Sequence, residues 1–282
     1  MLRHPRIKRL NAVFIIPALI LFSVHCKPSG TPSALEEEGS LKIEYSLEPG
    51  TVLKYKGTSS REMNFYGMNI RTVHTDRVTL TMREKTGDGN NRIRIRYDKT
   101  SDQLIRSGEM KKRSNPVNPE GRTVEVDVSP AGEVLEARGV IPGLPEGGLK
   151  DYVSKWFAEL PEEAVSVGEL WEEDISDTTE SSRVKGKMKM TMEGTGEENG
   201  IRVVYISGDV ITSVERETEG GNVKGEANAD VEAAIAIEGG YVVKYKMESE
   251  FKGTATGINP ETAKEETSEV SQTSYTTVEL IR

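Results

Sequence analysis

Residues 78–97 read VTLTMREKTGDGNNRIRIRY. Apolar residues alternate with polar ones on both sides of a central Gly-Asp-Gly-Asn, at Val78, Leu80, Met82, Ile93, Ile95 and Tyr97. Alternation of period two is typical of a strand with one buried face, and Gly and Asn tolerate the positive φ that tight turns require. The stretch therefore predicts a β-hairpin with one dry face, and a wet face that carries Arg92, Arg94 and Arg96.

The same alternation extends over most of the chain from Leu41 onward. Ile43, Tyr45 and Leu47 fall on one face of an early segment, and a second hairpin is predicted from residues 124–128 through a Ser-Pro-Ala-Gly turn to residues 134–135. The 27 glycines, the aromatic content of 6% and the frequent Thr and Val are typical of sheet proteins. We expect a first β half at residues 41–140 and a second β half at residues 167–282.

The middle of the chain, residues 141–166, interrupts this rhythm. After a loop rich in Pro and Gly, the apolar residues Leu149, Tyr152, Val153 and Trp156 have helical spacing. We expect a linker that contains one short helix at residues 149–158.

The second β half repeats the order of features in the first. Residues 49–53 are echoed by 167–171, the hairpin at 80–95 by 190–203, and the turn at 131–132 by the turn at 239–240, with offsets of roughly 108–118 residues. This order favours a tandem duplication, and one irregular sheet without repeats is the alternative. The expected fold class is mainly β, with two antiparallel meander halves that form a curved sheet or open barrel with one short central helix.

The first 25 residues have the organisation of an export signal. Residues 2–9 hold four basic residues and no acid, and residues 10–25 read LNAVFIIPALILFSVH, without a charged side chain if His25 is neutral. This run is shorter than a spanning helix requires, and it stops at Cys26, the single cysteine of the chain. We expect residues 1–25 to be a signal peptide that is removed.

Residues Ser23, Val24, His25 and Cys26 resemble the lipobox of bacterial lipoproteins, although the family pattern has a small residue at the position of His25 and Leu at that of Ser23. The resemblance implies a lipid anchor on Cys26, and two acyl chains are enough for stable membrane attachment. Lys27, where inner-membrane lipoproteins tend to have Asp, implies the outer membrane. Residues 26–40 then supply the attachment site and a flexible tether rich in Pro, Gly, Ser and Glu. An ordinary secretory signal with an incidental cysteine is the alternative.

Charge excludes one class of partner. Loss of four basic residues with the signal leaves 33 basic against 46 acidic residues, a formal charge of −13. A field of that sign repels phosphate backbones, so we expect no nucleic-acid partner.

The residue inventory offers little for catalysis. His74 is the one histidine beyond the signal, and we interpret it as a solvated residue on a polar strand face. No thiol is left after lipidation, so a Cys and His zinc site cannot be built. The Gly87–Asn91 turn and the acidic runs fit turn geometry and solvated edges better than calcium or catalytic sites. We expect no enzyme, no metal site and no cofactor.

A central segment carries a second resemblance. Leu160-Pro161, Val165, Val167-Gly168 and Trp171 are similar to the "LP…V.VGD.W" segment midway through a family of uncharacterised bacterial lipoproteins with strand-rich halves, although Glu169 replaces the Asp of that pattern. The family has no established activity, so the resemblance implies location and fold.

Two runs of apolar residues are candidates for ligand binding. Met188, Met190 and Met192 share one strand face, and the matching positions in the first half are Val78, Leu80 and Met82. Methionine adapts its shape to varied apolar ligands, although core packing is the plainer interpretation. The first hypothesis is a non-catalytic envelope lipoprotein that holds an apolar or lipid ligand in a concave sheet face, similar in architecture to half-barrel lipoprotein carriers. The second is a structural or interaction lipoprotein with a filled core and an acidic partner-binding surface.

Overall fold

The computed structural model describes residues 40–65, 68–106, 109–112, 117–144, 147–178, 182–218, 221–258 and 264–281. The predicted signal peptide, Cys26 and the tether up to residue 39 lie outside these residues. The elements are β1 (Val52–Phe65), β2 (Met68–Lys85), β3 (Asn91–Arg106), β4 (Glu109–Lys112), β5 (Thr123–Val128), β6 (Val134–Arg138), α1 (Leu149–Ser154), β7 (Leu170–Thr178), β8 (Ser182–Glu198), β9 (Ile201–Thr218), β10 (Gly221–Ala236), β11 (Val242–Ile258) and β12 (Glu265–Leu280).

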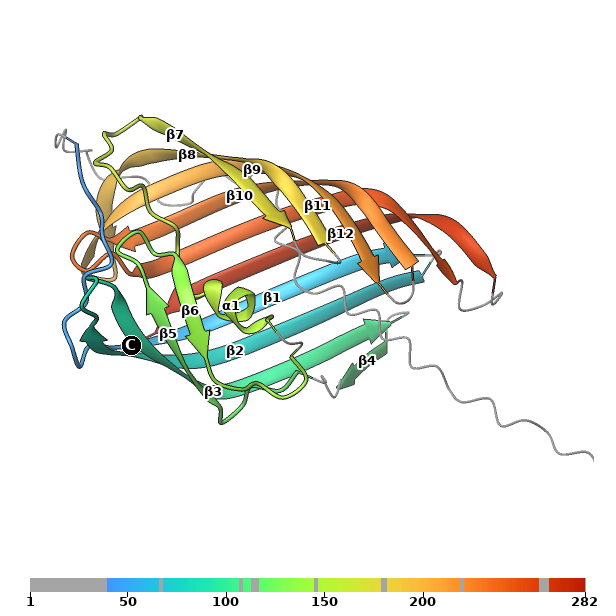
Figure 1. The fold of residues 1–282 in the computed structure, drawn as a ribbon, viewed down its shortest axis with the longest axis horizontal. Helices are drawn as coiled ribbons and strands as arrows, with labels where there is room; N and C mark the ends of the chain where they lie inside the picture. Colours follow the sequence, from blue (N-terminus) through green and yellow to red (C-terminus); the bar gives the residue numbers. More distant parts are fainter. Residues whose placement is uncertain are drawn as a thin grey trace, which may run out of the picture.

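All the strands belong to one antiparallel sheet in the order β6-β5-β3-β2-β1-β12-β11-β10-β9-β8-β7, and β4 pairs with β3. The first meander runs from the middle of the sheet to the β6 edge. The chain then crosses to the opposite edge, and the second meander returns from β7 to the middle, where β12 pairs with β1 (Figure 1). Within the described residues β6 and β7 do not pair, so the sheet is open. Figure 1 shows that it is also curved. The expected fold class is confirmed, whereas the duplication stays a prediction.

The sheet has two unlike faces, as the hairpin at residues 78–97 predicted. Val78, Leu80 and Met82 are at most 3% exposed. On the opposite face, Arg92 binds Asp127 at 2.9 Å and Arg94 binds Glu125 at 2.9 Å. We call the face that packs against α1 the concave face, and the sheet arches over the helix in Figure 1.

The helix is shorter than predicted. It ends at Ser154 instead of residue 158, because the chain tightens into turns in which the amides of Trp156 and Phe157 donate to the carbonyls of Val153 and Ser154. Trp156 therefore lies just beyond the helix, and its indole ring packs against the sheet. A Cβ at Gly57 would lie 2.7 Å from the indole Cη2, so the absence of a side chain there makes room for the ring.

The segment at residues 41–47 is extended and alternates as expected, but it is not a strand of the sheet. Ile43, Tyr45 and Leu47 are buried. The Tyr45 amide donates to the carbonyl of Pro130 at 2.8 Å and the Ser46 amide to that of Gly239 at 3.1 Å, so the segment bonds to loops on both halves. It crosses the end of the sheet where α1 lies, which we call the plugged end. The other end, where β1 meets β2, is the far end.

Candidate functional site

The six predicted ligand-binding residues all lie on the concave face. Val78, Leu80 and Met82 are on β2, and Met188, Met190 and Met192 are on β8, with five strands between. The curvature brings them into one core cluster, in which Met190 is 7% and Met192 3% exposed and Met188 packs against the rim. Protein atoms therefore already cover five of the six side chains. Their role in ligand binding stays a prediction.

Met190 illustrates how closely this region is packed. Its strand neighbour on β9 is Gly208, and a Cβ at that glycine would lie 2.3 Å from the Met190 sulfur. The Met190 thioether therefore packs directly against the backbone of Gly208. Flexible methionine side chains fill such irregular gaps well.

A second apolar cluster occupies the concave face toward the far end. It consists of Val214, Ala227, Phe251, Ala255 and Val270, with Val184 and Val223 at its border. Every one of these residues is on β8 to β12. Among the described residues, neither α1, the linker nor the 41–47 segment contributes to this cluster.

Small residues form the floor of the far-end cluster. A Cβ at Gly225 or Gly253 would lie 2.6 or 2.7 Å from the Phe251 ring, so that ring lies flat across two glycines. Ala227 and Ala229 continue the row along β10. Sequence reasoning missed this floor, although Gly225, Ala227 and Ala229 at alternate positions are a readable signal for a strand face without bulk.

His74 is not the solvated residue that the sequence predicted. It lies on the concave face, where its Nδ1 is 2.8 Å from Asp102 Oδ1 and its Nε2 is 2.8 Å from Asp76 Oδ2. Asp76 is 1% exposed, and it also accepts hydrogen bonds from Lys155 at 2.7 Å and from Thr100 at 2.8 Å. The prediction was wrong because partners two positions away on β2 and across on β3 become neighbours only when the hairpin folds.

The electrostatics of this group favour a charged imidazole. Burial alone would lower the pKa of His74, but the hydrogen bonds to Asp102 and Asp76 outweigh it and the pKa is raised. Burial alone would raise the pKa of Asp76, but the charge of Lys155 and the contact with His74 hold it well below the ordinary value. Both ring nitrogens can donate only in the imidazolium form. Since Lys155 directly follows α1, the group ties the helix to the sheet.

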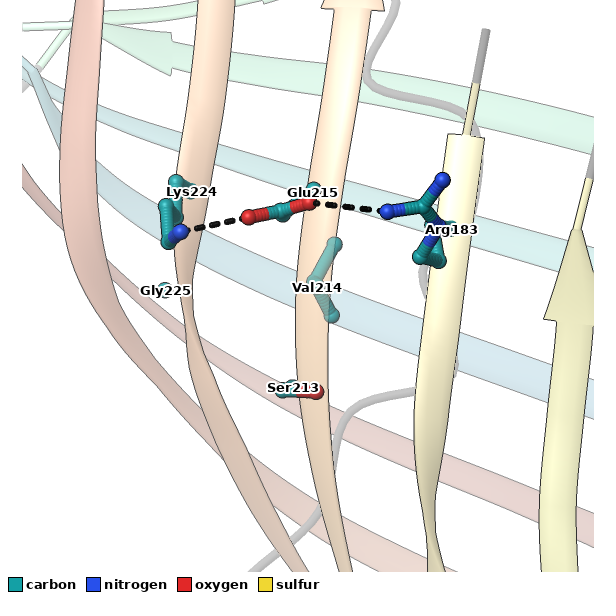
Figure 2. A pocket seen from close by; sticks show the side chains of 6 residues that line it. All are labelled: Arg183, Ser213, Val214, Glu215, Lys224 and Gly225. Atoms are coloured by element: carbon teal, nitrogen blue, oxygen red, sulfur yellow. Dashed lines mark hydrogen bonds and ion pairs between the residues drawn. The ribbon is translucent and has the colours of Figure 1, made fainter. Parts of the chain in front are cut away.

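The outer face has a pocket of about 240 Å³ near the far end, lined by Arg183, Ser213, Val214, Glu215, Lys224 and Gly225. Figure 2 shows Glu215 between Lys224 and Arg183, with an ion pair to each. The charged side chains thus form a row of ion pairs across three strands. A lining of this kind suits an apolar ligand poorly. No group of three or more His, Cys, Asp and Glu within the described residues could hold a metal ion.

Comparisons with known proteins give no family. No protein-family model and no curated protein matches the chain. A lipovitellin structure concerned with lipid–protein interactions is 11% identical with a TM-score of 0.45, and the match covers 84% of this chain and 26% of that one. DynF from the dynemicin biosynthesis pathway of Micromonospora chersina is 6% identical with a TM-score of 0.22, and the match covers 92% and 93% of the two chains. The chain thus spans about a quarter of the lipovitellin chain, and similarities of this degree define neither a family nor a function.

Among the helices in the described part of the chain, none has the length and apolar character needed to cross a membrane.

Proposed function

We propose that the chain is a membrane-anchored lipoprotein of the bacterial envelope that binds an apolar ligand, without catalysis, on the concave face of its sheet. One observation carries the ligand: the concave face has a second apolar cluster, at the far end, to which α1, the linker and the 41–47 segment contribute none of the described residues, although its core side chains are at most 5% exposed. In the plugged half, by contrast, Trp156, Phe157 and Leu160 pack over the strands. Ligand sites are lined predominantly by apolar side chains, and this cluster supplies such a lining away from α1 and the linker.

The shape of this region fits an elongated ligand. The small residues from Gly225 to Ala229 run along β10, and Val214 and Phe251 flank them on the neighbouring strands. At ~3.3 Å per residue, β10 from Val223 to Val231 extends over roughly 26 Å. An elongated ligand can lie along this row of small residues once the Phe251 ring, which lies over Gly225, turns aside.

The anchor rests on the sequence. The lipobox-like residues 23–26 follow an apolar run, and the tether to residue 40 gives the folded domain reach from the membrane surface. Attachment at Cys26 to the outer membrane is the location that the sequence favours.

The test is to purify the full-length chain from its native envelope, extract it with organic solvent and identify bound molecules by mass spectrometry. We expect a stoichiometric apolar molecule that a fluorescent fatty-acid probe can replace. Ala227→Phe fills the floor and should suppress probe binding, whereas Asn228→Gln, on the outer face of the same strand, is the matched control. Absence of any bound molecule, together with no probe binding, would contradict the proposal.

A second candidate is an interaction lipoprotein with a filled core. The observation in its favour is that Val78, Leu80, Met82, Met190 and Met192 are all at most 7% exposed. This candidate expects probe binding to be absent and the acidic outer surface to capture a partner.

A further inference from the structure

The outer face of the sheet carries a block of uncharged side chains at its centre, where β12 pairs with β1. These four strands lie side by side in the middle of the sheet in Figure 1. The block has eight positions, two on each strand, and we call it the neutral patch: Ser101 and Gln103 on β3, Val73 and Thr75 on β2, Thr58 and Ser60 on β1, and Tyr275 and Thr277 on β12. Charged residues are 29% of the chain, so about two of eight positions would be expected to hold one.

Strand register places these side chains in two adjacent rows. One row consists of Ser101, Thr75, Thr58 and Thr277, and the other of Gln103, Val73, Ser60 and Tyr275. Both rows face outward, because the alternate residues Asp76 on β2 and Val278 on β12 are buried in the core. Charged residues begin only at the border, where Arg71 pairs with Glu62 across the strands and its Nε donates to the Ser60 hydroxyl at 3.2 Å.

Tyr275 is the one aromatic side chain of the neutral patch, and it is 40% exposed. Within the described part of the chain, the hydroxyls of Thr58, Thr75 and Thr277 bond to no other side chain. They are therefore available to donors and acceptors from outside the protein. An accessible ring beside such hydroxyls offers a stacking surface and hydrogen-bonding groups together.

The size of the neutral patch distinguishes two kinds of partner. Adjacent strands lie ~4.8 Å apart and alternate residues of a strand ~6.7 Å apart, so the eight positions cover roughly 260 Å². A stable protein interface takes about 800 Å² from each partner, and aromatic and other apolar groups fill its core. Val73 and Tyr275 are the only large apolar side chains of the patch. Its area and composition suit a short polar ligand better than a protein.

We propose that the neutral patch binds an uncharged oligosaccharide, with one sugar ring stacked on Tyr275. A sugar ring presents C–H groups to an aromatic face, and its hydroxyls donate to and accept from Thr58, Thr277 and the Gln103 amide. A charged sugar would lose hydration here without gaining an ionic partner. The negative charge of the whole chain repels acidic sugars further. This site is on the opposite face from the concave ligand, so it does not depend on the proposed function.

The first test probes the purified full-length chain with hexasaccharides of three charge classes. The neutral probes are cellohexaose, maltohexaose and the N-acetylglucosamine hexamer, the basic probe is the deacetylated form of that hexamer, and the acidic probe is the galacturonic acid hexamer. We expect isothermal titration calorimetry to detect binding of at least one neutral probe and weaker binding of both charged ones. Binding of no neutral probe, or tighter binding of a charged one, would overturn the assignment.

Variants locate the binding. Tyr275→Ala should weaken binding of the best neutral probe by about tenfold, because the stacking contact is lost, whereas Tyr275→Phe keeps the ring and should stay within about threefold. Thr58→Glu places a charge in the patch and should also weaken binding. Ile211→Ala and Thr254→Glu change exposed residues elsewhere on the outer face, so they are the matched controls and should bind normally. Native affinity in both Tyr275→Ala and Thr58→Glu, with native melting temperatures, would refute the site.

A protein partner is the contrary outcome. A photo-crosslinking p-benzoylphenylalanine in place of Tyr275, irradiated in the intact envelope, forms a discrete protein adduct when a polypeptide covers the patch. We expect none. A discrete adduct that Thr58→Glu abolishes would assign the neutral patch to a protein and overturn the oligosaccharide site.

Discussion

Replacing Trp156 by alanine should be among the most destabilising single changes in the described chain. The side chain is 1% exposed, its Nε1 donates to the Tyr97 hydroxyl at 3.3 Å, and its ring lies 6.3 Å from that of Tyr55. A Trp→Ala change in a core costs about 3–5 kcal/mol, because the apolar burial is lost and a cavity remains. At this chain length that corresponds to a fall in melting temperature of about 6–20 °C.

Denaturant unfolding followed by circular dichroism measures the loss, and Trp171→Ala is the matched control. Trp171 is half-buried on the edge strand β7 and its indole nitrogen is unpaired, so we expect it to cost no more than about 2 kcal/mol. Each variant leaves the other of the two tryptophans for fluorescence. Equal losses of unfolding free energy in the two variants would show that burial of Trp156 does not stabilise the plugged end specifically.

Gly57 sharpens the same prediction. Its Cβ, if present, would be 2.7 Å from the indole, so Gly57→Ala in the native background should cost about 1–3 kcal/mol through overpacking. In the Trp156→Ala background the clash is gone and the cost should vanish. A double-mutant cycle that finds the two changes additive would refute the contact.

Three further predictions address other parts of the molecule. Because the pKa of His74 is raised on folding, its contribution to stability is complete below about pH 6.5 and is lost as the pH rises through the folded pKa. Urea unfolding at pH 6 and pH 9 should show this loss in the native chain and not in His74→Gln, and an equal loss in both would assign it to another group. Met190→Glu buries a charge and should cost about 3 kcal/mol or more in thermal unfolding. Normal melting combined with lost probe binding would instead place the ligand over the methionines. Cys26→Ser should abolish incorporation of labelled palmitate and move the protein from the membrane to the soluble envelope fraction, and continued labelling would contradict lipidation at this thiol.

Local patterns in the sequence predict the strands well, because period two reports directly on which face is buried. The hairpin at residues 78–97 and the apolar face of the linker at Val153 and Trp156 were readable in this way. The end of the helix at Ser154 was not, because it depends on where the sheet accepts the Trp156 ring. The role of Gly57 is likewise a property of two segments that are distant in the sequence.

The candidate site was harder to predict than the fold. Methionines attract notice as ligand-binding residues, yet most of them belong to the main core cluster, whereas the far-end cluster lies over a row of alanine and glycine. The partners of His74 are defined by strand pairing, which no local pattern encodes.

The pairing of β1 with β12 has a consequence for the order of folding. Tyr55 faces Leu280 and Phe65 faces Val270, so this junction joins residues more than 200 positions apart, in the middle of the sheet. A chain that emerges from its N-terminus forms the first meander with one edge of β1 unpaired, and that edge has no partner until the last described strand arrives. Unpaired strand edges are sites of aggregation, and contacts so distant in the sequence form slowly. A chain cut before β12 would therefore leave two bare edges, on β1 and β11, at the centre of what should be one continuous sheet.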